Sequence, residues 1–353
     1  MIQREGMMSI SVKGGIINMN DTMATTPPPY NRTGVNYHDV PRRAVAGTVI
    51  DVHTHTQKPH LTAEFLRAAD AYGIGRIFTM APLEDVDPLR AAFPGRFEFI
   101  AIPRWQDASS REDFFRIWHK RIDSFYEKGS RIIKFHMAPG SQKRFGATLD
   151  SPEVREIIEH AYNLGYHFMS HVGDPKAWFG ENAKYKPSEG HKAYHEQFAM
   201  LDRMLEKYPD RIHMGAHMGG SLEDIESLAR RLDRFPHYII DSSATKWMVR
   251  AVAEQPIEPL REFFIRYADR ILFGSDLVVN EKFNYEHYLS RYWVHLKLWE
   301  SDFDGECPID DPDARDGRPM LRGLHLPSAV LEKMYRTNAL EWLGAKVLKQ
   351  PLE

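Results

Sequence analysis

The chain has 353 residues, 42% of them hydrophobic, so it is long enough for one large α/β barrel or for two ordinary domains with a sizeable core. Its formal net charge of −3, with acids and bases interspersed, gives no electrostatic footprint for nucleic acid or an anionic membrane. The single cysteine, Cys307, excludes an internal disulfide and fits a reducing compartment, and we expect no catalytic role for it.

Neither a membrane span nor a secretory leader is predicted. The sequence contains no run of about 20 apolar residues. Its start, MIQREGMMSISVKGG, has charges and glycines where a secretory leader would be apolar. We therefore expect a cytoplasmic globular protein that acts on a small-molecule substrate, binds neither nucleic acid nor membranes, and could form a homo-oligomer.

Residues 1–46 are rich in Asn, Thr, Gly and Pro, including three consecutive prolines at 27–29, and show no sustained periodicity. This composition predicts an extended or partly disordered N-terminal arm in front of a single domain over residues 47–353. Because the arm has few apolar residues to anchor it, we expect that residues 1 to about 40 can be removed without loss of the domain.

From residue 48 onward, short apolar runs alternate with amphipathic stretches that have apolar residues at helical spacing and end at glycines such as Gly165. Eight strand–helix units in succession predict an α/β fold, a (β/α)8 TIM barrel. An open doubly wound sheet is the rival, but no GxGxxG or P-loop follows the first run. The predicted strands are 48–53, 75–80, 97–102, 131–136, 166–171, 211–217, 237–242 and 270–276.

Two connections exceed the minimal repeat: residues 172–197 after the fifth predicted strand, and residues 277–326 after the eighth. Both follow the carboxyl ends of strands, where the active sites of such barrels form. We therefore expect these segments to serve as lids over a site.

Polar side chains stand at the carboxyl ends of several predicted strands. The stretch DVHTH places His53 and His55 at the end of the first strand, two residues apart and thus on one face. His171, His217 and Asp276 end the fifth, sixth and eighth strands. A lone histidine is more often a satisfied core or surface residue, but five such residues at one barrel mouth favour a site. Three imidazoles and a carboxylate suit zinc or another divalent ion, with His217 as a base or electrophile.

Six motifs carry a resemblance to a known family: DVHTH, RIIKFHMAP, FMSHVGDP, HMGAHMGGS, IIDSSA and RILFGSDL, in this order. Together they resemble the amidohydrolase superfamily, and specifically its amidohydrolase-2 branch of metal-dependent barrel hydrolases and decarboxylases. The resemblance implies one divalent metal ion, most often zinc, with manganese or another ion as an alternative; some members work without a metal. The ligands that it implies are His53, His55, His171 and Asp276, with His217 near the substrate.

Lys134 and His136 lie on the fourth predicted strand, in IIKFH. In binuclear members of the superfamily a carboxylated lysine at the end of this strand bridges two metals. The preferred interpretation of Lys134 is instead a fixed positive charge near the site or an ion-pair partner. His136, on the same strand face, is expected to line the mouth.

Two further residues are candidates for substrate binding. Arg104, just beyond the third strand, could bind a substrate carboxylate through two hydrogen bonds, or could form a structural ion pair with Asp107 or another acid. Trp178, in the connection after the fifth strand, could wall a pocket for a planar anion or could simply pack that loop.

These residues predict a metal-dependent hydrolase of a small ester, lactone or amide, in which the metal activates a water molecule. Asp276 is the candidate general base, and His217 stabilises the oxyanion or shuttles protons. Non-oxidative decarboxylation of a small aromatic or unsaturated acid is the alternative. Decarboxylases of the family typically carry a longer insertion after the first strand, so the short segment TQKPHLT favours the hydrolase. The complete ligand set argues against an inactive metal-binding barrel.

Overall fold

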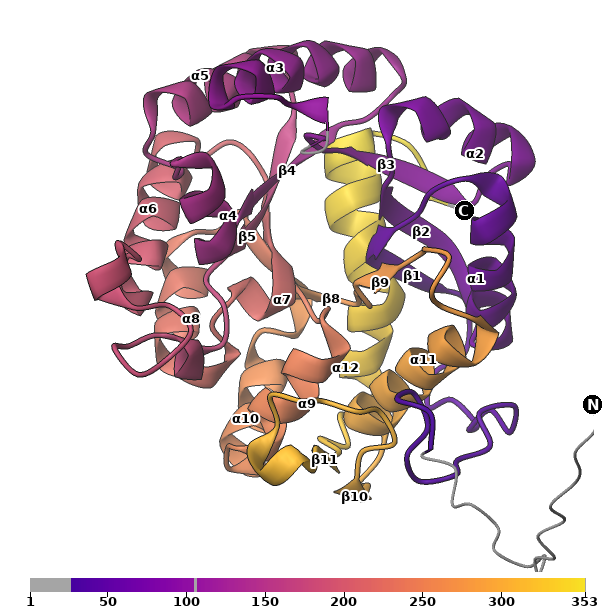
Figure 1. Ribbon diagram of the computed structural model, residues 1–353. Coiled ribbons are helices and arrows are strands. Elements are labelled where there is room, and N and C mark those ends of the chain that lie inside the picture. The colour runs from indigo at the N-terminus through magenta and orange to yellow at the C-terminus, as the bar shows by residue number, and fades with distance from the viewer. Residues whose placement is uncertain (1–26, 105–106, 353) are drawn as a thin grey trace, which may run out of the picture.

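The computed structural model describes residues 27–104 and 107–352, which form a barrel of parallel strands inside a ring of helices (Figure 1). Within one sheet the strand order is β8-β7-β6-β5-β4-β3-β2-β1-β9, and every pairing in it is parallel. The strands are β1 (Val49–His55), β2 (Ile74–Met80), β3 (Phe97–Ala101), β4 (Ile132–Met137), β5 (His167–Val172), β6 (His213–Gly215), β7 (Tyr238–Asp241), β8 (Ile271–Leu272) and β9 (Leu277–Val278).

The sheet closes on itself between β1 and the segment that contains β8 and β9. The backbone N–H of Val52 donates to the carbonyl of Phe273 at 2.9 Å, and the N–H of Asp276 donates to the carbonyl of His53 at 2.7 Å. Residues 271–278 thus pair with β7 at one end and with β1 at the other. The predicted (β/α)8 barrel is confirmed, and each predicted strand overlaps an observed one.

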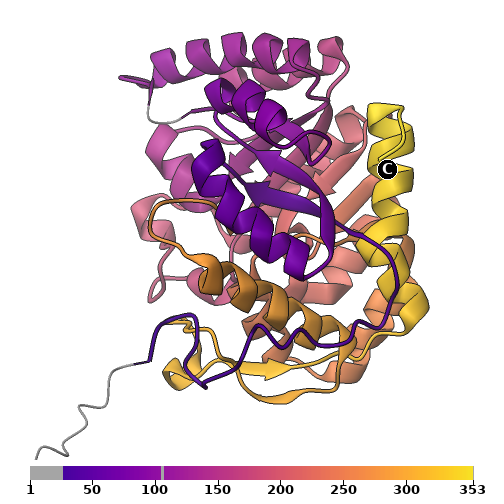
Figure 2. The same cartoon turned by 90° about the vertical axis from the view of Figure 1, so that its right-hand side faces the viewer.

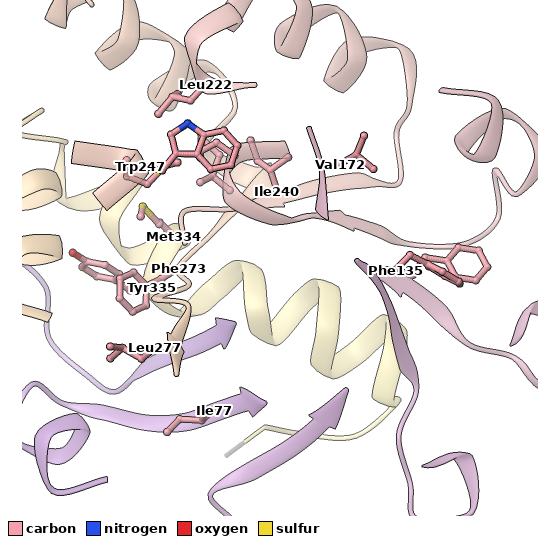
Figure 3. Close-up of a cluster of buried hydrophobic side chains, with 14 of the residues drawn as sticks. Ile77, Phe135, Val172, Leu222, Ile240, Trp247, Phe273, Leu277, Met334 and Tyr335 are labelled. Carbon is pink, nitrogen blue, oxygen red and sulfur yellow. The ribbon is translucent and has the colours of Figure 1, made fainter. Parts of the chain in front are cut away.

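Helices cover the outside of the barrel because each has one apolar face. Figure 3 shows side chains of this outer layer, among them Ile77, Phe135 and Val172, which belong to one large buried cluster. Gly165, in the left-handed region at φ 96°, stops α5 as expected. The main helices are α1 (Pro59–Ala71), α2 (Val86–Ala92), α3 (Arg111–Glu127), α5 (Pro152–Leu164), α6 (Tyr194–Lys207), α8 (Ile225–Arg234), α9 (Thr245–Ala253) and α10 (Ile257–Arg266).

The C-terminal helix closes one end of the barrel. It begins as α12 (Ser328–Glu332) and continues through the π-helical segments η8 (Lys333–Thr337) and η9 (Ala339–Leu348). Trp342 and Leu343 pack on the side chains that fill the barrel interior, including Ile50 and Ile132 from the amino ends of their strands. Figure 1 draws this helix in yellow behind the strands, and Figure 2 shows it at one end of the barrel. The carboxyl ends of the strands therefore form the opposite, open mouth.

The two long connections lie where the sequence predicts them. The first separates β5 from α6 and contains two short 3-10 turns, η3 (Lys176–Trp178) and η4 (Pro187–Glu189). The second follows β9 and holds α11 (Tyr285–Glu300) and an antiparallel pair, β10 (Asp304–Glu306) with β11 (Met320–Arg322). Both follow the carboxyl ends of strands, so they border the mouth.

Residues 27–48 contain no helix or strand, but they pack against the barrel. The side chain of Tyr37 is only 1% exposed, and its ring meets that of Trp293 on α11 edge to face, with 6.0 Å between centroids. The hydroxyl of Tyr72 donates to the carbonyl of Tyr37 at 2.9 Å. Figure 2 shows this segment running beside α11. Residues 1–26 of the predicted arm lie outside the described residues, and the domain boundary at 46 stays a prediction.

Among the helices of the described chain, none is both long and apolar enough to cross a membrane.

Substitution of Tyr37 by alanine is expected to lower the free energy of unfolding by about 3 kcal/mol, because a fully buried aromatic ring would be lost. Arg42, which is exposed in the same segment, provides the control: Arg42→Ala should change stability by less than about 0.5 kcal/mol. Urea denaturation measures both. Equal stabilities of the two variants would support the sequence-based expectation that the arm is dispensable up to about residue 40.

Candidate metal centre

A bulge in β1 decides where the two histidines of DVHTH point. Val52 packs in the barrel interior, so regular alternation would turn Thr54 inward and both His53 and His55 outward. Between residues 51 and 54 of β1, however, three residue steps face two steps of β2. The extra residue shifts the phase of the strand. As a result His53 and His55 both face the mouth, directly above the interior packing.

Three candidate ligands converge at this point. The Nε2 atoms of His53 and His55 lie 3.3 and 3.2 Å from Oδ1 of Asp276. Asp276 is in the left-handed region at φ 58°, which is uncommon for a non-glycine residue and is typical of functional sites. Burial opposes ionisation of this carboxyl, but the two imidazoles hold its pKa well below the usual range. Asp276 is therefore an anion at neutral pH.

A second carboxylate, Asp241 at the end of β7, orients His53. Its Oδ2 lies 2.9 Å from Nδ1 of His53, and because a carboxylate only accepts hydrogen bonds, Nδ1 carries the proton. Nε2 is thereby the nitrogen of His53 that faces Asp276 in the mouth, and it would bind a metal ion once it has lost its proton. Metal-binding histidines usually have such a carboxylate behind them. With ligand atoms of His53, His55 and Asp276 all within 4.8 Å of one another, the residues fit a divalent metal ion.

The same carboxylate positions His217. The backbone N–H of His217 donates to Oδ1 of Asp241 at 3.0 Å, and Nδ1 of His217 lies 2.7 Å from Oγ of Ser243. The Ser243 hydroxyl itself donates to Asp241, so it accepts from Nδ1–H of His217. The Nε2 atom of His217 is then unprotonated. Burial lowers the pKa of His217 well below its usual value, which keeps the ring neutral at neutral pH.

Asp241 and Ser243 are functional candidates that the sequence interpretation missed. The sequence pattern that could have pointed to them is IIDSSA, in which an acidic residue and two serines stand at the end of the seventh predicted strand. The sequence interpretation gave these two residues no role, because their partners lie on β1 and just after β6, about 190 and 25 residues away in the chain.

His171 lies in the mouth but is oriented differently from the other candidate ligands. Its ring centre is 4.5 Å from that of His217 and 4.8 Å from that of His136. Its Nε2, however, lies 3.2 Å from Oδ1 of Asp174, which follows β5. The structure thus brings His53, His55 and Asp276 together, with His171 beside them, and the role of His171 as a ligand stays a prediction.

Lys134 and His136 line the mouth from β4, as expected. The Nζ atom of Lys134 lies 2.7 Å from Nε2 of His53, and burial lowers the pKa of this lysine. His136 contacts Oγ of Ser141 through Nδ1 at 2.6 Å, and burial lowers its pKa to about 2. His136 is therefore neutral, whereas Lys134 places an amino group beside a nitrogen that would bind the metal.

Two cavities open from the mouth on either side of Val278. The first, about 410 Å³ in volume, extends from His55, Lys134 and His136 to Arg104 and Arg121. The second, about 360 Å³, lies over Asp276 and is bordered by both long connections. Its lining includes Trp178, Lys246, Trp247, Phe283, His287 and Arg291.

The two substrate-binding candidates, Arg104 and Trp178, line different cavities. Arg104 lines the first, where its Nε lies 3.0 Å from Oδ1 of Asp107 and its guanidinium also pairs with Glu84. Of the two sequence interpretations, the structure shows the ion pair. Trp178 lines the second cavity, with Nζ of Lys184 3.5 Å from the centre of its ring.

Cys307 is buried, and burial raises the pKa of its thiol to about 11, in accord with an unreactive cysteine.

A family model described as amidohydrolase matches residues 31–345. The chain belongs to the amidohydrolase family. It is therefore an enzyme of a family whose members usually bind metal, and its His and Asp groups could hold such an ion. No curated protein sequence matches this amidohydrolase.

Several solved structures match the amidohydrolase chain at low identity. A protein from Agrobacterium tumefaciens is 11% identical, with coverage of 85% of this chain and 97% of its own and a TM-score of 0.47. The 4-oxalomesaconate hydratase of Rhodopseudomonas palustris is 13% identical, with coverage of 85% and 98% and a TM-score of 0.45. An N-acyl-D-glutamate deacylase from Bordetella bronchiseptica, solved with zinc and a phosphonate inhibitor, is 12% identical, with coverage of 65% of both chains and a TM-score of 0.40. At identities of 11–13% and TM-scores below 0.5, these matches assign neither a substrate nor a reaction to this chain.

We predict about one divalent ion per chain of this amidohydrolase, with zinc expected, and loss of that ion in the double variant His53→Ala, His55→Ala. Elemental analysis of protein purified without chelators measures it. Absence of metal from the wild-type protein would contradict the prediction, whereas two ions per chain and extra mass on Lys134 would support a carboxylated lysine.

A graded effect is expected for Asp241→Asn. The amide can still accept a hydrogen bond from His53, but it lacks the charge that increases the basicity of Nε2, so metal affinity should fall about 10- to 100-fold without being abolished. Competition with a metallochromic chelator measures this affinity. Asp233→Asn, at an exposed acid on α8, is the control and should bind metal as the wild type does.

Proposed function

We propose that this amidohydrolase hydrolyses a small ester, lactone or amide with the help of one divalent metal ion. The observation that carries the proposal is the convergence of His53, His55 and Asp276 at the point where two cavities meet. The ligand set leaves room for a water molecule and a substrate oxygen, which is the composition of hydrolytic metal sites. Such an ion, when bound, polarises the substrate carbonyl and increases the acidity of water.

Asp276 is the residue proposed to accept the proton of the attacking water. Its carboxylate is ionised at neutral pH, because the facing imidazoles hold its pKa well below the usual range. The same low pKa makes Asp276 a weak base, so the proton must pass on readily to the leaving group. This is the expected behaviour of a carboxylate that transfers a proton from nucleophile to leaving group.

His217 is proposed as a partner in proton transfer. The contact of Nδ1–H with Ser243 leaves Nε2 as a proton acceptor, so the neutral ring is better suited to moving a proton than to donating a hydrogen bond to an oxyanion. Lys134, 2.7 Å from Nε2 of His53, supplies positive charge on the cavity wall where negative charge develops in the transition state.

Decarboxylation of a small aromatic or unsaturated acid is the second candidate, supported by the amino group of Lys134 beside the ligand cluster, which would attract a carboxylate when protonated. The connection between β1 and α1 supports hydrolysis instead, because it consists of residues 56–58 only. Turnover of a panel of lactones, esters, amides and aromatic acids, with acid release and carbon dioxide both monitored, tests the proposal. Acid release without carbon dioxide is expected, and carbon dioxide release alone would establish the lyase.

Substitutions of His217 and Asp276 distinguish a residue that binds the metal from one that only transfers protons. His217→Asn is expected to keep near-normal metal content and to lower turnover about 100-fold or more, the scale of a lost acid–base group. Asp276→Asn should have the larger effect, because it weakens a ligand and removes the proposed base. If His217→Asn lost its metal while Asp276→Asn kept metal and activity, His217 would belong among the ligands in place of Asp276.

A further inference from the structure

Positive charge is distributed unequally between the two cavities. In the first, both arginines are neutralised: Arg104 pairs with Glu84 and Asp107, and Arg121 lies 3.1 Å from Glu84 and 3.6 Å from Asp107. Two guanidinium groups and two carboxylates make a closed network. The first cavity therefore has no arginine charge left to attract an anionic ligand.

The second cavity contains an arginine without a counter-ion. Arg291 of α11 donates from Nη1 to Oγ of Ser290 at 2.9 Å and to the carbonyl of His287 at 3.5 Å. Among the carboxylates whose side chains the structure describes, which leave out Asp316, none lies within 4.0 Å of its guanidinium. The titratable groups that act on it most are Tyr37 and Cys307, which are both uncharged at neutral pH. Burial lowers the pKa of Arg291 only to about 10, so the group stays charged. A partly buried cation with no anionic partner is costly for the fold.

Four carboxylates, those of Asp174, Asp276, Asp311 and Asp313, line the same cavity, but none of them forms an ion pair with Arg291. Lys246 of α9 lines the same cavity, and burial together with repulsion by Arg291 lowers its pKa. Three acids act on Lys246, namely Asp310, Asp311 and Asp313, but Asp311 is already paired with Arg250. Asp276, at the floor of the cavity, is bound by His53 and His55. Arg291 is thus left as the cation that a ligand can neutralise.

Four aromatic side chains form part of the wall of the second cavity. Trp178 and Trp247 border one side, and the rings of Phe283 and His287 lie stacked with centroids 3.7 Å apart. Burial lowers the pKa of His287 to about 3, so this ring is neutral and adds no charge. A cavity of about 360 Å³ with aromatic rings in its wall suits a small planar molecule.

We infer that Arg291 binds a carboxylate of the substrate in the cavity between α9 and α11, while the bond to be cleaved lies over Asp276. The substrate class is then a small planar ester, lactone or amide that carries a carboxylate remote from the scissile bond. The identity of the scissile group rests on the proposed function, whereas anion binding by Arg291 does not. A guanidinium suits this role because its planar fork matches the geometry of a carboxylate.

Equilibrium binding of benzoate and of neutral benzamide tests the inference without any turnover, so an error in the proposed reaction would not affect the result. Isothermal titration uses the full chain after chelator treatment, which removes metal as a competing site for the carboxylate. Arg291→Met is expected to weaken benzoate binding at least about tenfold and to leave benzamide binding unchanged, since only benzoate uses the charge. The control Arg230→Met, at an exposed arginine of α8 paired with Glu226, should bind both ligands as the wild type does.

Arg291→Lys keeps the charge and is the variant to use if Arg291→Met does not fold. It should bind benzoate more weakly than the wild type, because an ammonium lacks the two parallel donors, with benzamide again unchanged. The inference is overturned if the wild-type protein shows no saturable benzoate binding, if the Arg291 variants bind benzoate as the wild type does, or if they lose benzoate and benzamide equally. Loss of benzoate binding in Arg104→Met alone would overturn it too, and would place the anion in the first cavity.

Discussion

The arrangement of the polar residues at the mouth of the barrel depends on the buried carboxylate of Asp241, which binds residues from three segments of the chain. This carboxylate is wholly inaccessible, and a charge in that position is tolerated only with several hydrogen-bond donors. His53 donates to one oxygen, and the backbone N–H groups of His217 and Ser243 donate to the other at 3.0 and 3.1 Å. These contacts keep the pKa of Asp241 below its usual value despite burial. One side chain on β7 thereby fixes a candidate ligand on β1 and a candidate proton carrier after β6.

Close approach of the strands makes this network feasible. A Cβ atom on Gly274 would lie 2.9 Å from Cβ of His53 and 3.1 Å from that of Ser243, so only glycine fits between β7 and β1 at this level. Below it, the barrel interior is filled by apolar side chains and covered by the C-terminal helix. Water and ligands therefore reach the polar residues from the open mouth, where the long connections form the two cavities.

The two cavities differ in whether their arginine side chains are paired with acids, and this difference decides which cavity can bind an anionic ligand. Around Arg104 and Arg121, acids and bases are balanced, which stabilises the edge of the mouth and leaves neither guanidinium free to bind an anion. Around Arg291 the fold keeps a cation that it does not neutralise. Residues that lower stability in this way are common at functional sites, where ligand binding compensates the cost. The cavity beside α11 is accordingly the part of the mouth where specificity is expected to lie.

The sequence by itself determined the barrel and the residues that could line its mouth, because both depend on local patterns. Strands and helices follow from apolar periodicity, and the polar residues that end the strands, such as His53, His217 and Asp276, are placed at one rim by the parallel topology. Lys134 and His136 were located in the same way.

Only the tertiary structure decided how these residues act. The inward direction of His53 and His55 depends on a bulge that a regular two-residue alternation does not reveal. The importance of Asp241 depends on partners from β1 and from the residues just after β6, and the pairing of Arg104 depends on Glu84 from the segment before α2. Whether an arginine is neutralised or left for a ligand is settled by residues distant in the chain, since charges interact through space and not along the sequence.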